Sequence, residues 1–118
     1  MYSQTFARTM PRGLRVAHRI VWRRVARDDL LSLYDWIADQ AGAAVALDYT
    51  AKIEASAETL SDFPNRGTPR DDLLPSLRTL MYRRRTTIAY RVERDIVEIL
   101  RLSHGGRDLG GLFDVGED

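Results

Sequence analysis

Residues 78–109, RTLMYRRRTTIAYRVERDIVEILRLSHGGRDL, decide the fold of this 118-residue chain. Three successive segments within them have the composition of strands. Residues 80–85 mix apolar, aromatic and basic side chains, and residues 86–93 alternate with a period of two. Residues 96–102 are apolar with two single charges, as expected of a strand covered on both faces. Because the link at residues 93–95 fits a hairpin loop, the stretch predicts an antiparallel meander.

Two amphipathic helices are predicted between a first strand and this meander. Residues 18–25, HRIVWRRV, have strand composition, and the carboxylates of Asp28 and Asp29 are placed to cap and complement a helix N-terminus. Gly42 is a natural stop for that helix, and a second helix is expected over about residues 43–61. The short link makes the two helices an antiparallel hairpin. The side chains at helical spacing that should be buried are Leu30, Leu33, Tyr34, Ile37 and Ala41, then Ala46, Tyr49, Ile53, Ala57 and Leu60.

The chain has the length of one domain, for which we predict an α+β fold in the order β-α-α-β-β-β. This domain is expected over residues 18–109. A flexible basic N-terminal arm, residues 1–17, should precede it, and an acidic glycine-containing tail, residues 110–118, should follow. Prolines and a glycine predict a loop without regular structure from residue 62 to 75, with Phe63 tucked under the helix hairpin.

Composition excludes several classes of protein. The chain is 44% hydrophobic and 30% charged, which is ordinary for a globular domain, and no apolar run approaches the roughly 20 residues of a membrane helix. It contains no cysteine, so disulfides and thiolate metal sites are impossible. The N-terminus lacks the apolar core of a signal peptide, and we therefore expect a cytoplasmic protein.

Charge is unevenly distributed although the formal net charge is only +1. Residues 1–27 hold seven arginines and no acid, residues 28–62 hold eight acids and one lysine, and residues 78–94 hold six arginines and one glutamate. A basic sheet backed by an acidic helical layer would suit a polyanion or an acidic partner. The same pattern equally fits solvated faces that neutralise one another within the fold.

The sequence contains no glycine-rich nucleotide-binding motif, no zinc-protease motif and no serine-nucleophile motif, and we expect neither a metal nor a cofactor. Metal-free RNA cleavage would need an acid, a base and cations. His104 could move a proton, whereas Glu98 and Tyr82 are candidates for the second group only by default. A lone histidine before two glycines more often holds a turn. The cations available for such a reaction are Arg83, Arg85, Arg91 and Arg101.

An ordered set of motifs runs from residue 20 to residue 109. The set comprises VWRRVARDDL at 21–30, YDWIA at 34–38, FPNRG at 63–67, IAYRV at 88–92 and VEILRLSHG at 97–105, with the pairs Leu77-Arg78, Tyr82-Arg83 and Arg107-Asp108. This set resembles the ParE branch of the RelE/ParE superfamily, the toxins of bacterial type II toxin–antitoxin modules. The resemblance implies the β-α-α-β-β-β fold, neutralisation by a ParD-like antitoxin, and inhibition of DNA gyrase by protein binding without catalytic residues.

The resemblance leaves a second branch open. RelE-like members cleave messenger RNA on the ribosome, in which case Arg83, Arg85, Arg101 and His104 would be catalytic. The single lysine and the lack of a tyrosine after Tyr90 favour the ParE branch. A third hypothesis is a basic module that binds nucleic acid through its arginine face and N-terminal arm. For an acidic antitoxin and for the target, the partner-binding residues we expect are Arg78, Arg83, Arg85, Arg91, Arg101, His104 and Arg107.

Overall fold

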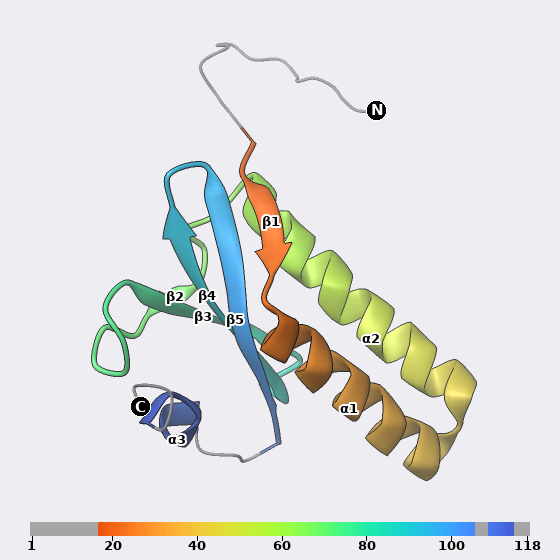
Figure 1. The fold of residues 1–118 in the computed structure, drawn as a ribbon. Coiled ribbons are helices and arrows are strands. Elements are labelled where there is room, and N and C mark those ends of the chain that lie inside the picture. Colours follow the sequence, from red (N-terminus) through yellow and green to blue (C-terminus); the bar gives the residue numbers. More distant parts are fainter. Residues whose placement is uncertain (1–16, 106–108, 115–118) are drawn as a thin grey trace.

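A helix hairpin covers one face of a five-stranded sheet (Figure 1). The computed structural model describes residues 17–105 and 109–114. Its strands are β1 Arg19–Trp22, β2 Thr68–Pro69, β3 Leu77–Tyr82, β4 Thr86–Glu93 and β5 Ile96–His104. They lie in the order β1-β5-β4-β3-β2, with β1 parallel to β5 and every other pair antiparallel. The predicted α+β fold, with its antiparallel meander, is confirmed.

The helix hairpin consists of α1, Arg24–Ala41, and α2, Ala43–Glu58, followed by the short 3-10 helix η3, Thr59–Ser61. Gly42 ends α1 with φ 99°, a left-handed conformation that side chains disfavour, so the predicted glycine stop is confirmed. The hairpin buries its apolar stripes against the sheet. The main contributors to this core are Leu30, Leu33, Ile37, Ala46, Ile53, Ala57, Leu60, Leu80, Ile88, Tyr90, Val97, Ile99 and Leu102.

The start of α1 differs from the prediction. Strand β1 ends at Trp22, and α1 begins at Arg24 rather than near residue 28. Asp28 and Asp29 therefore lie inside the helix, and the N-cap, Arg23, has no side-chain cap. The expected capping role was wrong because Asp29 accepts hydrogen bonds from the sheet instead. Ala41, expected in the buried stripe, is exposed because the hairpin tip extends beyond the sheet (Figure 1).

Three further expectations were wrong. Phe63 is 60% exposed rather than tucked under the hairpin. The loop expected to lack regular structure contains β2, which pairs two residues with β3. Strand β3 starts at Leu77, and residues 83–85 form the turn to β4 rather than the end of a strand. For β2 and β3, pairing with the neighbouring strand outweighed a local composition signal.

The second face of the sheet has its own small core. Leu77, Ala89 and Leu100 are buried there, and Phe113 packs against them. Phe113 belongs to α3, Leu109–Asp114, whose position is seen in Figure 1. This helix includes part of the segment expected as an acidic tail. Almost all of the expected N-terminal arm and residues 115–118 lie outside the described residues.

Helix lengths and polarity also bear on membrane insertion. Within residues 17–105 and 109–114, no helix combines the length and the apolar character needed to cross a bilayer.

Candidate functional site

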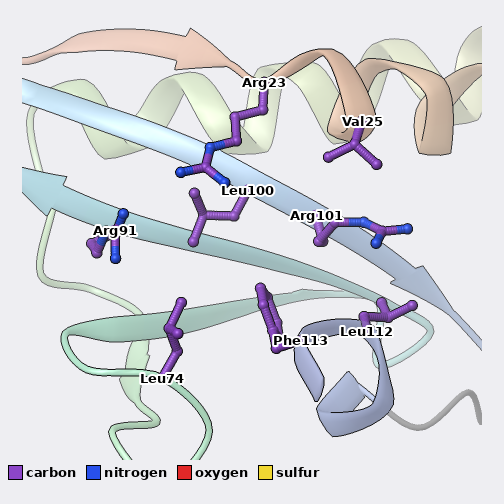
Figure 2. A pocket seen from close by; sticks show the side chains of 8 residues that line it. All are labelled: Arg23, Val25, Leu74, Arg91, Leu100, Arg101, Leu112 and Phe113. Atoms are coloured by element: carbon purple, nitrogen blue, oxygen red, sulfur yellow. The ribbon is translucent and has the colours of Figure 1, made fainter. Parts of the chain in front are cut away.

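The sheet face opposite the helix hairpin carries a basic pocket of about 380 Å³, which we name the arginine pocket. Figure 2 shows Arg23, Arg91 and Arg101 around the apolar side chain of Leu100, with Phe113 of α3 on the far side. An apolar floor ringed by guanidinium groups suits a partner that combines carboxylates with apolar side chains. The remaining lining residues are Val25, Leu74 and Leu112.

A β-bulge in β5 lets two successive residues line this pocket. In the pairing with β4, Tyr90 lies opposite Ile99 and Ala89 lies opposite Arg101, so Leu100 is the additional residue. Side chains normally alternate between the two faces of a strand. The bulge interrupts that alternation, and both Leu100 and Arg101 line the arginine pocket.

Glu98 lies between two of the arginines. Nε of Arg23 donates to Oε2 of Glu98 at 2.9 Å, whereas Nη2 of Arg91 lies 3.8 Å from Oε1. The second distance allows an ion pair but is too long for a hydrogen bond. Arg91 therefore keeps guanidinium donors for a partner.

Arg101 is held more firmly, by a carboxylate from α1. Its Nε and Nη2 donate to the two oxygens of Asp29 at 2.9 and 3.0 Å, and the backbone N–H of Leu102 donates to Asp29 Oδ2 at 2.9 Å. This fork geometry raises the pKa of Arg101, chiefly through the hydrogen bonds to Asp29. Strand β1 pairs with β5 only as far as Trp22. Beyond that point, the carboxylate of Asp29 accepts a hydrogen bond from the backbone of β5 in place of a neighbouring strand.

Arg78 takes part in fixing a loop. Its Nη1 donates to the carbonyl oxygens of Asn65 and Gly67 at 3.0 and 2.7 Å. The hydroxyl of Tyr90 donates to the carbonyl of Pro64 at 2.8 Å and accepts from the N–H of Gly67 at 2.9 Å. A Cβ on Gly67 would lie 2.6 Å from that hydroxyl. The FPNRG motif is thus a loop anchored to the sheet by one tyrosine and one arginine.

The turn from β3 to β4 carries three arginines. Arg83 and Arg84 have φ of 54° and 59°, and the N–H of Arg85 donates to the carbonyl of Tyr82 at 3.1 Å. Positive φ at both central positions is the geometry of a type I′ turn, which asparagine and glycine normally occupy. All three arginines are exposed, and none forms a salt bridge within the part of the chain that the structure describes.

His104 lies in a second pocket, of about 480 Å³, between α1 and the end of β5, which we name the His104 pocket. Nδ1 of His104 is 2.8 Å from the hydroxyl of Thr86, and that hydroxyl is 3.0 Å from the hydroxyl of Tyr49. Burial, and secondarily the positive charge of Arg85, lower the pKa of His104. The ring is therefore held in a fixed orientation, and its neutral form is favoured. The pocket is lined by Ser32, Leu33, Trp36, Arg85, Leu102 and His104, among others.

The predicted site residues are thus divided among several places. Arg91 and Arg101 line the arginine pocket, Arg85 and His104 line the other, and the residues proposed for a nuclease are not gathered in one pocket. Arg107 lies outside the described residues. Sequence reasoning missed Arg23 and Phe113, which come from the β1–α1 junction and from α3. Of the other predicted site residues, Arg78 holds the FPNRG loop and Arg83 lies on the turn between β3 and β4.

The described residues were also considered as possible metal ligands. Across residues 17–105 and 109–114, the side chains of histidine, aspartate and glutamate form no group of three that could hold a metal ion.

A helix hairpin on one face of a sheet, with the first strand parallel to the last, agrees with the fold of RelE/ParE superfamily toxins, and comparisons of sequence and structure place the protein in this class. A family model described as the ParE toxin of the type II toxin–antitoxin system parDE matches residues 20–109. Toxin ParE3 of Caulobacter vibrioides is 32% identical over 91 residues, which cover 77% of this chain and 90% of that toxin. The chain belongs to the ParE toxin family of type II toxin–antitoxin systems.

Solved structures agree with this family. The chromosomal ParDE toxin–antitoxin system from P. aeruginosa contains a chain that is 28% identical, with a TM-score of 0.67 over 75% of this chain and 97% of that one. The RelBE2 toxin–antitoxin complex from Mycobacterium tuberculosis contains a chain that is 24% identical, with a TM-score of 0.56 over 78% of this chain and 95% of that one. The second similarity shows a shared fold.

Proposed function

We propose that this ParE-family protein arrests growth by binding and inhibiting DNA gyrase, and that a ParD-like antitoxin neutralises it. The match of the ParE toxin family model to residues 20–109, which include the helix hairpin and all of the sheet except Arg19, carries the proposal. The lining of the His104 pocket adds support, because metal-free RNA cleavage needs both an acid and a base, and neither Glu98 nor Tyr82, the candidates for the second proton-transfer group, lines that pocket.

The antitoxin contact is proposed at the arginine pocket. Arg91 has guanidinium donors left over beside Glu98, and Leu100 and Phe113 offer apolar surface next to them. A segment of the antitoxin with acidic side chains spaced among apolar ones would satisfy both features.

A supercoiling assay tests this function. Purified toxin without antitoxin would be incubated with gyrase, ATP and relaxed plasmid. Inhibition at near-stoichiometric toxin, reversed by adding the antitoxin encoded beside it, is the expected result. Undiminished supercoiling by a preparation that still arrests growth would contradict the proposal.

A matched pair of variants tests the antitoxin contact. Arg91→Ala should weaken antitoxin binding about tenfold or more, since a charge-assisted hydrogen bond at an interface contributes roughly 1.5–3 kcal/mol. Arg94→Ala is the control, because Arg94 is an exposed arginine on the β4–β5 turn outside the pocket. Equal affinities of the two variants, measured by calorimetry, would remove the arginine pocket from the interface.

A further inference from the structure

The His104 pocket has one flat aromatic wall. Trp36 of α1 is 53% exposed, although tryptophan is among the side chains that gain most from burial. Its ring centroid lies 5.6 Å from that of His104, at an interplanar angle of 56°. Leu33 and Leu102 supply apolar surface beside it. A flat ligand ring placed on Trp36 would cover the exposed indole face by stacking.

The other end of the pocket is cationic. Arg85 is exposed, has no acid partner in a salt bridge among the described residues, and lies at the end of the arginine turn. Its carbonyl accepts from the N–H of Gly105 at 2.8 Å, which fixes the turn against the end of β5. His104 presents a second nitrogen, Nε2, because Nδ1 is the one engaged by Thr86. When Nδ1 accepts from the Thr86 hydroxyl, Nε2 carries the proton, and a guanidinium with an imidazole N–H suits a phosphate.

The acids around the pocket decide where such an anion would lie. Asp29 also lines the pocket, but its oxygens already accept from Arg101 and Leu102. Asp35 and Asp39 are exposed on α1, outside the lining of the pocket. A negative group is therefore favoured at the turn, and an uncharged ring is favoured along α1.

We propose that the His104 pocket binds a nucleotide, with the base against Trp36 and the phosphate between Arg85 and His104. The pocket volume of about 480 Å³ lies within the range of roughly 300–1,000 Å³ typical of small-ligand sites. The nucleotide is either a free mononucleotide or one residue of a single strand, whose neighbouring phosphates would meet Arg83 and Arg84. This site is independent of the proposed action on gyrase.

Intrinsic fluorescence of Trp36 is a direct probe of the site. The chain has two tryptophans, so Trp22→Phe leaves Trp36 as the only tryptophan, which can be excited at wavelengths longer than those that tyrosine absorbs. This variant would be titrated with adenosine 5′-monophosphate, with adenosine and with a short single-stranded oligodeoxyadenylate. Saturable quenching by the monophosphate, with a dissociation constant at least tenfold lower than that of adenosine, is the expected result.

Matched variants locate the phosphate. Arg85→Gln should raise the dissociation constant about tenfold or more, whereas Arg94→Gln, at the turn at the other end of the β4 strand, should leave it unchanged. Thermal melting of each variant checks that the fold is retained. A ring-to-ring contact between adenine H8 or H2 and the indole protons of Trp36, observed by NMR, would place the base directly.

The two sources of the nucleotide give different results. Equal affinity for the monophosphate and the oligomer indicates a mononucleotide site. Tighter binding of the oligomer that is lost in Arg83→Gln/Arg84→Gln indicates a single-strand site, and both results support the proposal. Unchanged Trp36 emission with every probe, or equal losses in Arg85→Gln and Arg94→Gln, would overturn it.

Discussion

The arginine pocket and the His104 pocket both combine arginines with apolar side chains, but they differ in how the arginines are held. Arg101 is fixed by Asp29 through two hydrogen bonds, and Arg23 by Glu98 through one. Arg85 projects from a strained turn with no acid in salt-bridge distance among the described residues. This arginine-rich chain therefore contains arginines with structural roles and arginines whose guanidinium donors are free to bind a partner.

Asp29→Ala should produce the largest effect on stability. The substitution leaves the Arg101 guanidinium and the Leu102 N–H without their acceptor, and the Asp29 side chain is only 14% exposed. We expect a loss of about 3 kcal/mol in the free energy of unfolding, because a buried donor and charge lose their partner. Chemical denaturation measures it. Asp28→Ala, an exposed neighbour, is the control and should change stability by less than about 0.5 kcal/mol.

Arg78→Ala should produce the second-largest loss of stability. It tests the distinction between arginines with structural roles and arginines that are free to bind a partner. Its guanidinium donates to two backbone carbonyls of the FPNRG loop, so its loss should cost about 2 kcal/mol. Arg91→Ala, whose ion pair is partly exposed and 3.8 Å long, should cost less than about 0.5 kcal/mol. Urea unfolding of the two variants side by side decides this. Similar losses would show that Arg91 is also a structural residue.

Replacing the arginine turn should have a smaller effect, of opposite sign. Arg83→Asn with Arg84→Gly installs the residues that a type I′ turn prefers, so we expect a gain of about 1 kcal/mol in stability. Binding of the oligodeoxyadenylate should weaken in the same variant if the turn contacts neighbouring phosphates. A loss of stability would indicate that these arginines make favourable contacts in the fold.

The smallest expected change in stability comes from the titration of His104. Burial lowers the pKa of His104 in the folded state, so the unfolded chain binds a proton more readily. The contribution of His104 to stability is complete above its ordinary value of about 6.5 and is lost as pH falls through the lowered folded value. Comparing the pH dependence of melting in wild type and His104→Gln isolates this contribution. A wild-type curve that is no steeper than the variant's across that window would contradict the assignment.

The sequence predicted the elements well because strand alternation and helical stripes report burial directly. Ile53 and Leu60, both fully buried, lie on the helix face that the helical spacing had identified. The prediction that Asp29 caps a helix was wrong because its position in the sequence suits a cap. Its hydrogen bond with the Leu102 N–H at the edge of β5 depends on the assembled sheet. The bulge at Leu100 and the packing of Phe113 depend on contacts between segments that no local pattern contains.

The candidate site was predicted as a set of arginines and a histidine, but the residues that accompany each of them could not be. Arg101 and His104 are three positions apart on one strand, so alternation alone separates them onto opposite faces, as the two pockets do. Which acids pair with which arginines depends on Asp29 and Glu98, and these come from different elements. Trp36 was part of a recognised motif, yet its exposure beside His104 is a property of the assembled fold.

The central claim, that the toxin acts on gyrase by binding and not by catalysis through His104, has one direct test. Wild type and His104→Ala would be compared for inhibition of gyrase supercoiling and for trapped cleavage complexes on plasmid DNA. We predict equal inhibition by the two proteins, and equal growth arrest when each is expressed. Growth arrest without gyrase inhibition, accompanied by cleavage of ribosome-bound messenger RNA that His104→Ala abolishes, would contradict the account.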